Sequence, residues 1–178
     1  MLQTELKFST LKECNELRQH LLHDVRNVAP TKITVLQNDT PLMNEVISDR
    51  IELTPFRVKK HSKDNVKYLF KLDVTAKENI RHVTCLDFVS DQKECLPVSQ
   101  FPKTEINKNG GVLICTLRKG QRLNVEFEVE YGFSRDHTKF SPVILAIFNE
   151  TKKKDIYLFS VETNGSMTPE EVMDQFSS

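Results

Sequence analysis

Two segments in the middle of the chain alternate between apolar and mostly polar residues, and this alternation constrains the fold most. In residues 66–74, every second position is Val, Tyr, Phe or Leu. In residues 123–131, apolar residues alternate with Asn124, Glu126, Glu128 and Glu130. Successive side chains of a strand point to opposite faces, so both segments are predicted to be half-buried strands with one solvated face.

Shorter apolar runs predict further strands on both sides of these two. The turn residues Asn109-Gly110-Gly111 and Lys119-Gly120 separate some of them. The centre of the chain, from about residue 57 to 155, is therefore expected to be rich in strands and poor in helix. The additional strands are predicted at residues 33–36, 82–88, 112–117, 143–148 and 156–161.

A helix is predicted near the N-terminus. Thr10 followed by Glu13 has the spacing of a capping box. The apolar residues that follow recur every three or four positions, which predicts an amphipathic helix of about five turns ending before Pro30. Its apolar stripe must pack on a sheet or on another helix; the stripe consists of Leu11, Cys14, Leu17, Leu21, Leu22, Val25 and Val28.

A second helix is predicted near residue 176. Thr168 is a suitable cap, Pro169 suits the first helical position, and two glutamates follow near the positive end of the helix dipole. Val172, Met173 and Phe176 begin an apolar stripe. Isolated helices shorter than about 12–15 residues are marginal in water, so this helix needs a surface to pack against.

The charge balance argues against a general nucleic-acid binder. The chain has 178 residues, and its 25 Lys plus Arg are matched by 25 Asp plus Glu. No stretch approaches the roughly 18 apolar residues of a membrane span, and residues 1–8 do not have the pattern of a signal peptide. We therefore expect a soluble, intracellular protein without a membrane partner.

The cysteines and histidines do not have the spacing of a metal site. Four cysteines occur without a Cys-x-x-Cys pair, which favours reduced and partly buried thiols. His20 and His23 share one helix face, but no HExxH motif surrounds them. We therefore expect neither a metal nor another cofactor; the cysteines are Cys14, Cys85, Cys95 and Cys115.

Motifs of catalysis are weak in this sequence. The five glycines form neither a phosphate-binding loop nor a GxGxxG turn, and there is no GxSxG motif. Asp136-His137, or Cys14 with His20 or His23, could be read as catalytic pairs, but such pairs arise by chance in most chains of this length. The Lys59-Lys60-His61 and Lys152-Lys153-Lys154 clusters are interpreted as solvated turns; a phosphate contact within a larger complex is the alternative.

Three segments in order nevertheless resemble one family. The helix at residues 15–22, leading to residues 28–31 and a short strand, resembles the assembly helix of the α subunit of bacterial RNA polymerase. Residues 44–56 are similar to a loop of that family in which an arginine precedes alternating apolar residues and a proline. Residues 159–171, from Phe159 to Glu171, resemble its strand, turn and capped dimerisation helix.

Two further segments resemble the archaeal counterpart of the α subunit and its eukaryotic counterpart, the third-largest subunit of RNA polymerase II. Residues 120–123 match the start of a strand in the inserted domain, and residues 136–143 match its His-x-Lys-aromatic-x-Pro turn. The resemblance implies an α+β fold: a discontinuous dimerisation domain, helices on a small sheet, with an inserted β-rich domain. We place the former at residues 1–56 plus 155–178 and the latter at residues 57–154.

The resemblance also implies a function in transcription. It implies a non-catalytic assembly subunit of a DNA-directed, multisubunit RNA polymerase, which pairs with a smaller related subunit or with itself and docks the large catalytic subunits. DNA and RNA would be contacted only indirectly, through the complex. No Asp-x-Asp-x-Asp cluster is present to hold the Mg²⁺ of nucleotidyl transfer. The implied large-subunit contacts are Arg18, Arg50, Ile51 and Leu53, and the implied subunit interface is Leu17, Leu21, Leu22, Val25, Val172, Met173 and Phe176.

The chain departs from the family pattern at several positions. Gln19 replaces the second arginine of a usual pair, Asp49 stands where many members have His, and Glu52 stands where Gly is common. The cysteines that bind metal in some inserts have no equivalent. These departures indicate a divergent member, of the kind that a virus or a plasmid could carry.

Two other classes of function stay open at this point. One is a free-standing β-rich interaction module or viral adaptor unrelated to transcription, which would need a self-sufficient core. The other is a small hydrolase that uses Asp136 and His137, which is disfavoured because no nucleophile or oxyanion motif accompanies them.

Overall fold

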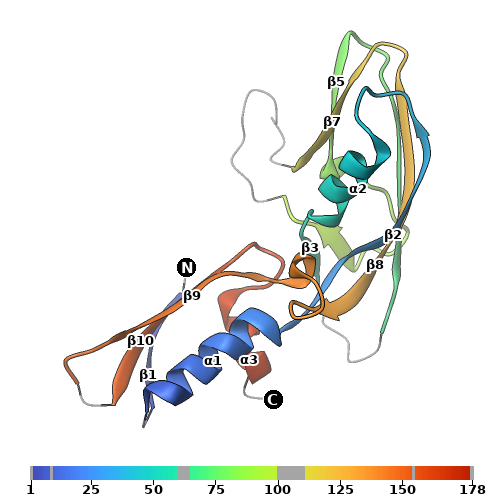
Figure 1. Cartoon of the computed structure of the whole chain (residues 1–178). Coiled ribbons are helices and arrows are strands. Elements are labelled where there is room, and N and C mark those ends of the chain that lie inside the picture. The colour runs from blue at the N-terminus through green and yellow to red at the C-terminus, as the bar shows by residue number, and fades with distance from the viewer. Residues whose placement is uncertain (1, 9, 60–64, 100–110, 154, 177–178) are drawn as a thin grey trace. The chain divides into compact units, whose positions relative to one another are not determined.

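The computed structural model describes residues 2–8, 10–59, 65–99, 111–153 and 155–176; the predicted turn at Asn109-Gly110 is outside these ranges. The chain divides into two compact units (Figure 1). Unit 1 combines Met1–Asn27 with Gly132–Ser178, and unit 2 is Val28–Tyr131. The chain is an α+β protein, as the sequence predicts.

Unit 1 is built from helices on one face of an antiparallel sheet. Its sheet has the strand order β1-β10-β9, and β1 pairs with β10 through a register in which Thr4 lies opposite Phe159. The side chain of Thr10 accepts a hydrogen bond from the Glu13 backbone N–H at 3.3 Å, which caps the first helix. The elements are β1 (Leu2–Lys7), α1 (Leu11–His23), η2 (Thr138–Phe140), β9 (Val143–Glu150), β10 (Ile156–Thr163) and α3 (Pro169–Phe176).

The short helix α3 has the cap that the sequence predicts. The Thr168 hydroxyl accepts a hydrogen bond from the Glu171 N–H at 3.2 Å, and the Glu171 carboxylate accepts one from the Thr168 N–H at 2.6 Å. This reciprocal pair is a complete capping box. A further tie comes from Gln175, whose side-chain amide both donates to and accepts from the backbone of Arg26. Helix α3 is thereby joined to the start of β2 (Arg26–Asn38), the strand that follows α1.

Unit 2 is a set of antiparallel sheets with one helix. The largest sheet has the order β2-β8-β4, and β3 pairs with β6 while β5 pairs with β7. The two predicted alternating segments form neighbouring strands of this sheet, β8 in the centre and β4 beside it, and Phe70 lies opposite Phe127 in their register. The elements are β2, α2 (Asn44–Glu52), β3 (Phe56–Val58), β4 (Tyr68–Thr75), β5 (Ile80–Thr84), η1 (Cys85–Asp87), β6 (Cys95–Pro97), β7 (Leu113–Arg118) and β8 (Arg122–Phe133).

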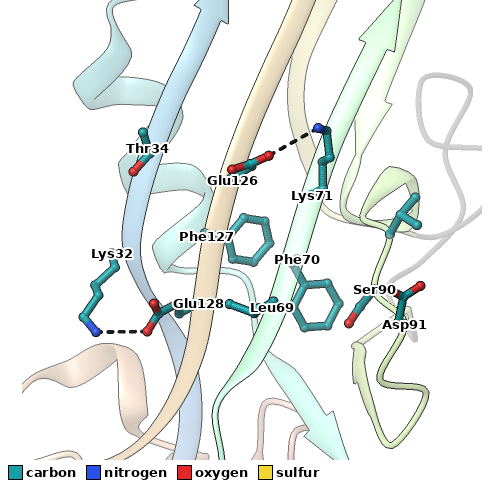
Figure 2. A pocket seen from close by; sticks show the side chains of 11 residues that line it. Lys32, Thr34, Leu69, Phe70, Lys71, Ser90, Asp91, Glu126, Phe127 and Glu128 are labelled. Atoms are coloured by element: carbon teal, nitrogen blue, oxygen red, sulfur yellow. Dashed lines mark hydrogen bonds and ion pairs between the residues drawn. The ribbon is translucent and has the colours of Figure 1, made fainter.

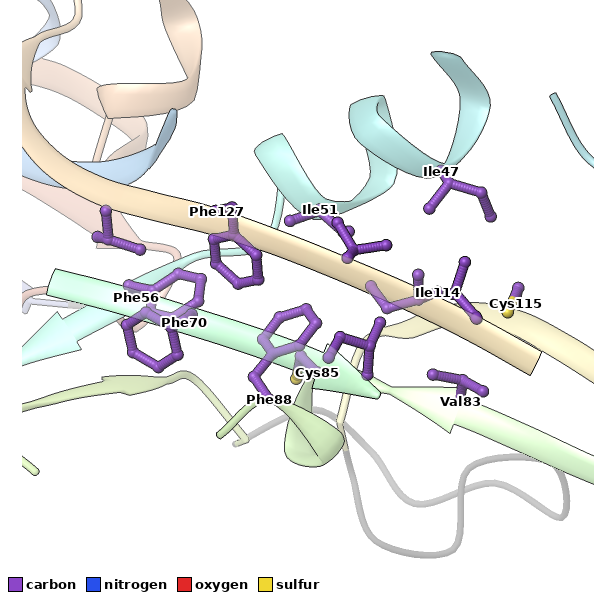
Figure 3. Packing of buried hydrophobic residues seen from close by; sticks show 14 of the residues in the cluster. Ile47, Ile51, Phe56, Phe70, Val83, Cys85, Phe88, Ile114, Cys115 and Phe127 are labelled. Atoms are coloured by element: carbon purple, nitrogen blue, oxygen red, sulfur yellow. The ribbon is translucent and has the colours of Figure 1, made fainter. Parts of the chain in front are cut away.

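Phenylalanine rings fill the core of unit 2 (Figure 3). Phe70 and Phe127 stack with ring centroids 5.4 Å apart, and Phe56 meets Phe70 edge to face at 5.0 Å. Ile47 and Ile51 of α2 are fully buried in the same cluster. The inward positions of the alternating strands therefore supply the core, as the period of two requires.

The N-terminal helix is shorter than the sequence pattern indicates. Helix α1 ends at His23, and Val25 and Val28 lie beyond it although both are buried. The prediction of a helix up to Pro30 is wrong. Val25 and Val28 are three positions apart, as they would be on one helix face, but the extended segment at the start of β2 buries four consecutive residues. The spacing of the two valines therefore does not distinguish a helix from a strand. Pro30 is tolerated inside β2 because β2 is at the edge of its sheet, where a missing N–H does not break a ladder.

Residues 44–56 are not mainly a loop, so that expectation also needs correction. Asn44–Glu52 forms α2, since Ile47 and Ile51 are four positions apart and share a buried helix face. The helix ends before Pro55, and the Thr54 hydroxyl donates to the Arg50 carbonyl at 2.9 Å. The short strands β1, β3 and β6 are not apparent from the sequence pattern.

The compact units have different bounds from the expected domains. The chain passes between the units at residues 27/28 and 131/132, inside β2 and β8, whereas the expected boundaries follow residues 56 and 154. Helix α2 and all of β2 from Val28 on therefore belong to unit 2. The division into a dimerisation domain and an insert stays a prediction.

Candidate protein interfaces

Most of the expected subunit interface is buried within unit 1 itself. Leu17, Leu21, Val25 and Val172 are at most 1% exposed. They form one cluster with inward-facing residues of the sheet, including Phe159. The inward parts of both helices are thus buried without a partner, and the assignment of these residues to a subunit interface stays a prediction.

Three members of the expected interface keep exposed surface. Leu22 and Met173 are half-buried at the margin of the cluster, and Phe176 is 45% exposed. The Phe176 ring meets His20 of α1 edge to face, with ring centroids 5.2 Å apart. A partner that binds the helix-covered face of unit 1 would contact these three residues, and not the buried leucines.

Arg18 is held by its own unit. Its Nε donates a hydrogen bond to the Ala146 carbonyl oxygen of β9 at 3.1 Å, 128 positions away in the sequence. This bond fastens α1 to the sheet. Because a guanidinium has five N–H donors, the remaining donors of Arg18 can still serve a second acceptor.

Arg50, Ile51 and Leu53 have different environments although they are close in sequence. The Arg50 guanidinium donates to the Ile114 carbonyl of β7 at 2.8 Å, and Ile51 is fully buried. Leu53, at the end of α2, is 66% exposed, and Met43, before its first residue, is 69% exposed. The ends of α2 are therefore the parts that offer apolar surface.

A ladder of opposite charges covers the outer face of the β2-β8-β4 sheet. Lys67 lies 2.6 Å from the Glu130 carboxylate, Lys32 lies 3.0 Å from Glu128, and Lys71 lies 3.2 Å from Glu126. The glutamates of β8 thus form the solvated strand face that the sequence predicts. Their lysine partners come from β2, β4 and the residue before β4. These pairings are not apparent from the sequence pattern.

The ladder changes the acidity of Glu130. The Lys67 ammonium, followed by smaller effects of Glu128 and Lys32, lowers the pKa of Glu130 to about 2, and the same hydrogen bonds raise the pKa of Lys67. Lys32 reaches this cluster from a left-handed backbone conformation with a φ of 46°. Both charged forms are therefore favoured on this face throughout the neutral range.

The cysteines are buried, as expected, and burial makes them unreactive. It raises the pKa of Cys95 to about 12 and that of Cys115 to about 11, and it also raises the pKa of Cys14 and Cys85. Such thiols stay protonated near neutral pH, so they are poor nucleophiles.

The other residues considered for chemistry serve turns or lie at the surface. His137 accepts a hydrogen bond from the Lys139 N–H at 3.2 Å within the η2 turn. Lys153 pairs with Glu5 at 3.0 Å, while Lys60, His61 and Lys154 are outside the described residues. In the part of the chain that the structure describes, no group of three or more His, Cys, Asp or Glu could hold a metal ion. No described helix is long and apolar enough to cross a membrane.

The fold and these surfaces define an α+β protein in which a helix-covered sheet accompanies a β-rich unit. The family model described as the RNA polymerase Rpb3/RpoA insert domain matches residues 20–147. The chain belongs to this family. All of unit 2 lies within the matched residues.

Curated relatives carry the same family resemblance at low identity. The chain is 26% identical to the DNA-directed RNA polymerase subunit Rpo3 of Methanocaldococcus jannaschii, over 90% of this chain and 75% of that protein. It is 21% identical to Rpo3 of Methanobrevibacter smithii, over 76% of this chain and 49% of that protein. It is 25% identical to the DNA-directed RNA polymerase II subunit rpb3 of Dictyostelium discoideum, over 80% of this chain and 52% of that protein. The chain therefore spans about half the length of two of these three relatives.

Proposed function

We propose that this chain is a non-catalytic assembly subunit of a DNA-directed, multisubunit RNA polymerase, acting in transcription inside the cell. The observation that carries the proposal is the family match over residues 20–147. The names of the archaeal and Dictyostelium relatives support it. In this role the chain contacts DNA and RNA only through the complex, which fits its balanced charge.

The proposed partner of unit 1 is a smaller related subunit or a second copy of the chain. The half-exposed residues at the margin of the helices, Leu22, Met173 and Phe176, are the proposed contacts. Leu17, Leu21, Val25 and Val172 support this surface from beneath, since they fill the core under the helices. An interface that begins at such apolar side chains can extend over the neighbouring polar surface of α1.

The proposed contacts to the large subunits are Arg18, Arg50 and Leu53. Leu53 offers an exposed apolar side chain. Both guanidinium groups keep donors beyond those bonded to β9 and β7. Ile51 acts indirectly, because its burial in the core of unit 2 fixes the position of α2.

The proposal is tested by purifying the tagged chain from the cells that naturally express it. Mass spectrometry then gives the masses of the chains that copurify. We expect two very large chains, together with RNA synthesis that depends on a DNA template. Leu53→Asp should release the large chains, whereas Ile80→Asp, at another exposed apolar residue of unit 2, should not. A preparation that contains neither large chain would overturn the proposal.

A second set of variants separates the two proposed interfaces. Met173→Asp with Phe176→Asp should release the smaller partner and leave the fold of unit 1 intact, because both side chains keep solvent exposure. The Leu21→Asp variant is unsuitable for this purpose, since Leu21 is fully buried and an unpaired charge at this position would unfold the unit.

A free-standing interaction module is the second candidate function. The observation that favours it is that Leu17 and Leu21 of α1 and Val172 of α3 are buried inside the chain itself. A sharp unfolding transition of the isolated monomer, with a midpoint independent of protein concentration, would support this candidate. A midpoint that rises with concentration would support the assembly subunit.

A further inference from the structure

The charge ladder on the outer face of unit 2 is interrupted at one position. On β4, Leu69 lies opposite Glu128, and Lys71 lies opposite Glu126. Lys67, two residues before Leu69, pairs with Glu130. Leu69 thus stands between Lys67 and Lys71, where the alternation along this strand leads one to expect another lysine, and its side chain is 64% exposed.

A short segment beside β4 adds an apolar residue and an acid to this position. Val89 and Lys71 exchange backbone hydrogen bonds of 2.8 and 2.9 Å, and the Gln92 side chain accepts the Leu69 N–H at 2.9 Å. These bonds hold residues 89–92 against the edge of the strand. Val89 is 68% exposed. The carboxylate of Asp91 has no ion pair with any residue that the structure describes.

These residues line a groove of about 510 Å³ (Figure 2), a volume typical of ligand sites, which range over about 300–1,000 Å³. Figure 2 shows the two ion pairs that border it, Lys32 with Glu128 and Lys71 with Glu126. Among the described residues that line it, the groove therefore has three carboxylates and two ammonium groups, and Asp91 is the charge left over. It offers apolar contact at Leu69 and Val89, together with one uncompensated negative charge.

We propose that this groove binds an arginine side chain of a partner polypeptide. The aliphatic stem of the arginine packs on Leu69 and Val89, and its guanidinium donates to the Asp91 carboxylate. Arginine suits the site better than lysine because its planar, weakly hydrated guanidinium can bond a carboxylate through two parallel N–H groups. The site lies within unit 2 and does not depend on the proposed role in a polymerase.

The test is a titration of the isotope-labelled full chain with the peptide acetyl-Gly-Arg-Gly-amide. NMR chemical shifts of the backbone amides report binding. We expect shifts at residues 69–71, 89–91 and 126–128, and none with the peptide in which norleucine replaces arginine. Leu69→Lys supplies the missing cation from within the chain, so it should weaken binding at least about threefold, the scale of an exposed ion pair. Asp91→Asn should weaken binding to a similar extent.

The control variant is Ile80→Lys, which adds the same charge at an exposed residue of unit 2 that does not line the groove. It should leave the affinity within the error of the titration. Equal weakening by Leu69→Lys and Ile80→Lys would overturn the proposal, because the effect would then be one of net charge. Chemical-shift changes scattered over other acidic surfaces would overturn it as well. So would a peptide with lysine in place of arginine that binds as tightly as the arginine peptide.

Discussion

The guanidinium of Arg50 donates a 2.8 Å hydrogen bond to the carbonyl oxygen of Ile114, and this bond joins α2 to β7. The two residues are 64 positions apart. The same arginine offers its own backbone carbonyl to the Thr54 hydroxyl at the end of the helix. Arg50 therefore organises the helix that carries the proposed docking residue Leu53.

The Arg50→Met variant is expected to lower the free energy of unfolding of unit 2 by about 1 kcal/mol. Methionine keeps the apolar stem, but it leaves the Ile114 carbonyl without this donor, and a typical protein hydrogen bond contributes about that amount. Urea unfolding measures the loss. Arg118→Met, at an exposed arginine of β7, is the matched control and should change stability less. Equal effects of the two variants would contradict the structural role of Arg50.

The Leu21→Ala variant is expected to destabilise unit 1 by about 2–5 kcal/mol, the usual cost of a cavity at a fully buried leucine. Leu22→Ala is the matched control at the next position, where the side chain is only half-buried and water can fill the space. Hydrogen exchange at the α1 amides measures both effects within unit 1. If the two variants lower protection equally, the helix does not face the sheet as described.

The sequence predicts elements best where the local pattern agrees with the tertiary fold. The alternation in residues 123–131 suffices for β8 because every second residue enters one core, and Thr168-Pro169 suffices for the start of α3. Strand β1 has no such signal. It depends on pairing with β10, in which Leu2 lies opposite Val161.

The candidate interface was less predictable than the fold for a related reason. A helical stripe in a sequence shows which side chains need burial, but not whether the chain itself or a partner buries them. Here Val143, Phe159 and Met167, far along the chain, cover Leu17 and Leu21. The bonds of Arg18 and Arg50 likewise end on carbonyls 128 and 64 positions away. Residues at the margin, such as Phe176, keep surface for a partner.

Acid is expected to weaken unit 2 through Glu130. Its pKa is about 2 in the folded protein, below the ordinary value of 4.5, chiefly because of Lys67. The stabilisation from this carboxylate is therefore complete above pH 4.5 and is lost as the pH falls toward 2. The stability difference between the native protein and Glu130→Gln should shrink over that interval in urea unfolding. Glu78→Gln, at an exposed residue of unit 2, should show no such trend.

The Gly132→Ala variant is expected to destabilise unit 1 by about 1–3 kcal/mol, the typical cost of overpacking. A Cβ at this position would lie 2.6 Å from Cζ of Phe140, and two further ring atoms would be within 2.8 Å. The ring cannot easily move away because Phe140 is itself buried. Thermal unfolding of Gly132→Ala, Phe140→Leu and the double variant forms a cycle that isolates this contact. The smaller leucine should relieve part of the cost, so the double variant should be more stable than the sum of the single changes; strict additivity would show that the strain lies elsewhere in the backbone.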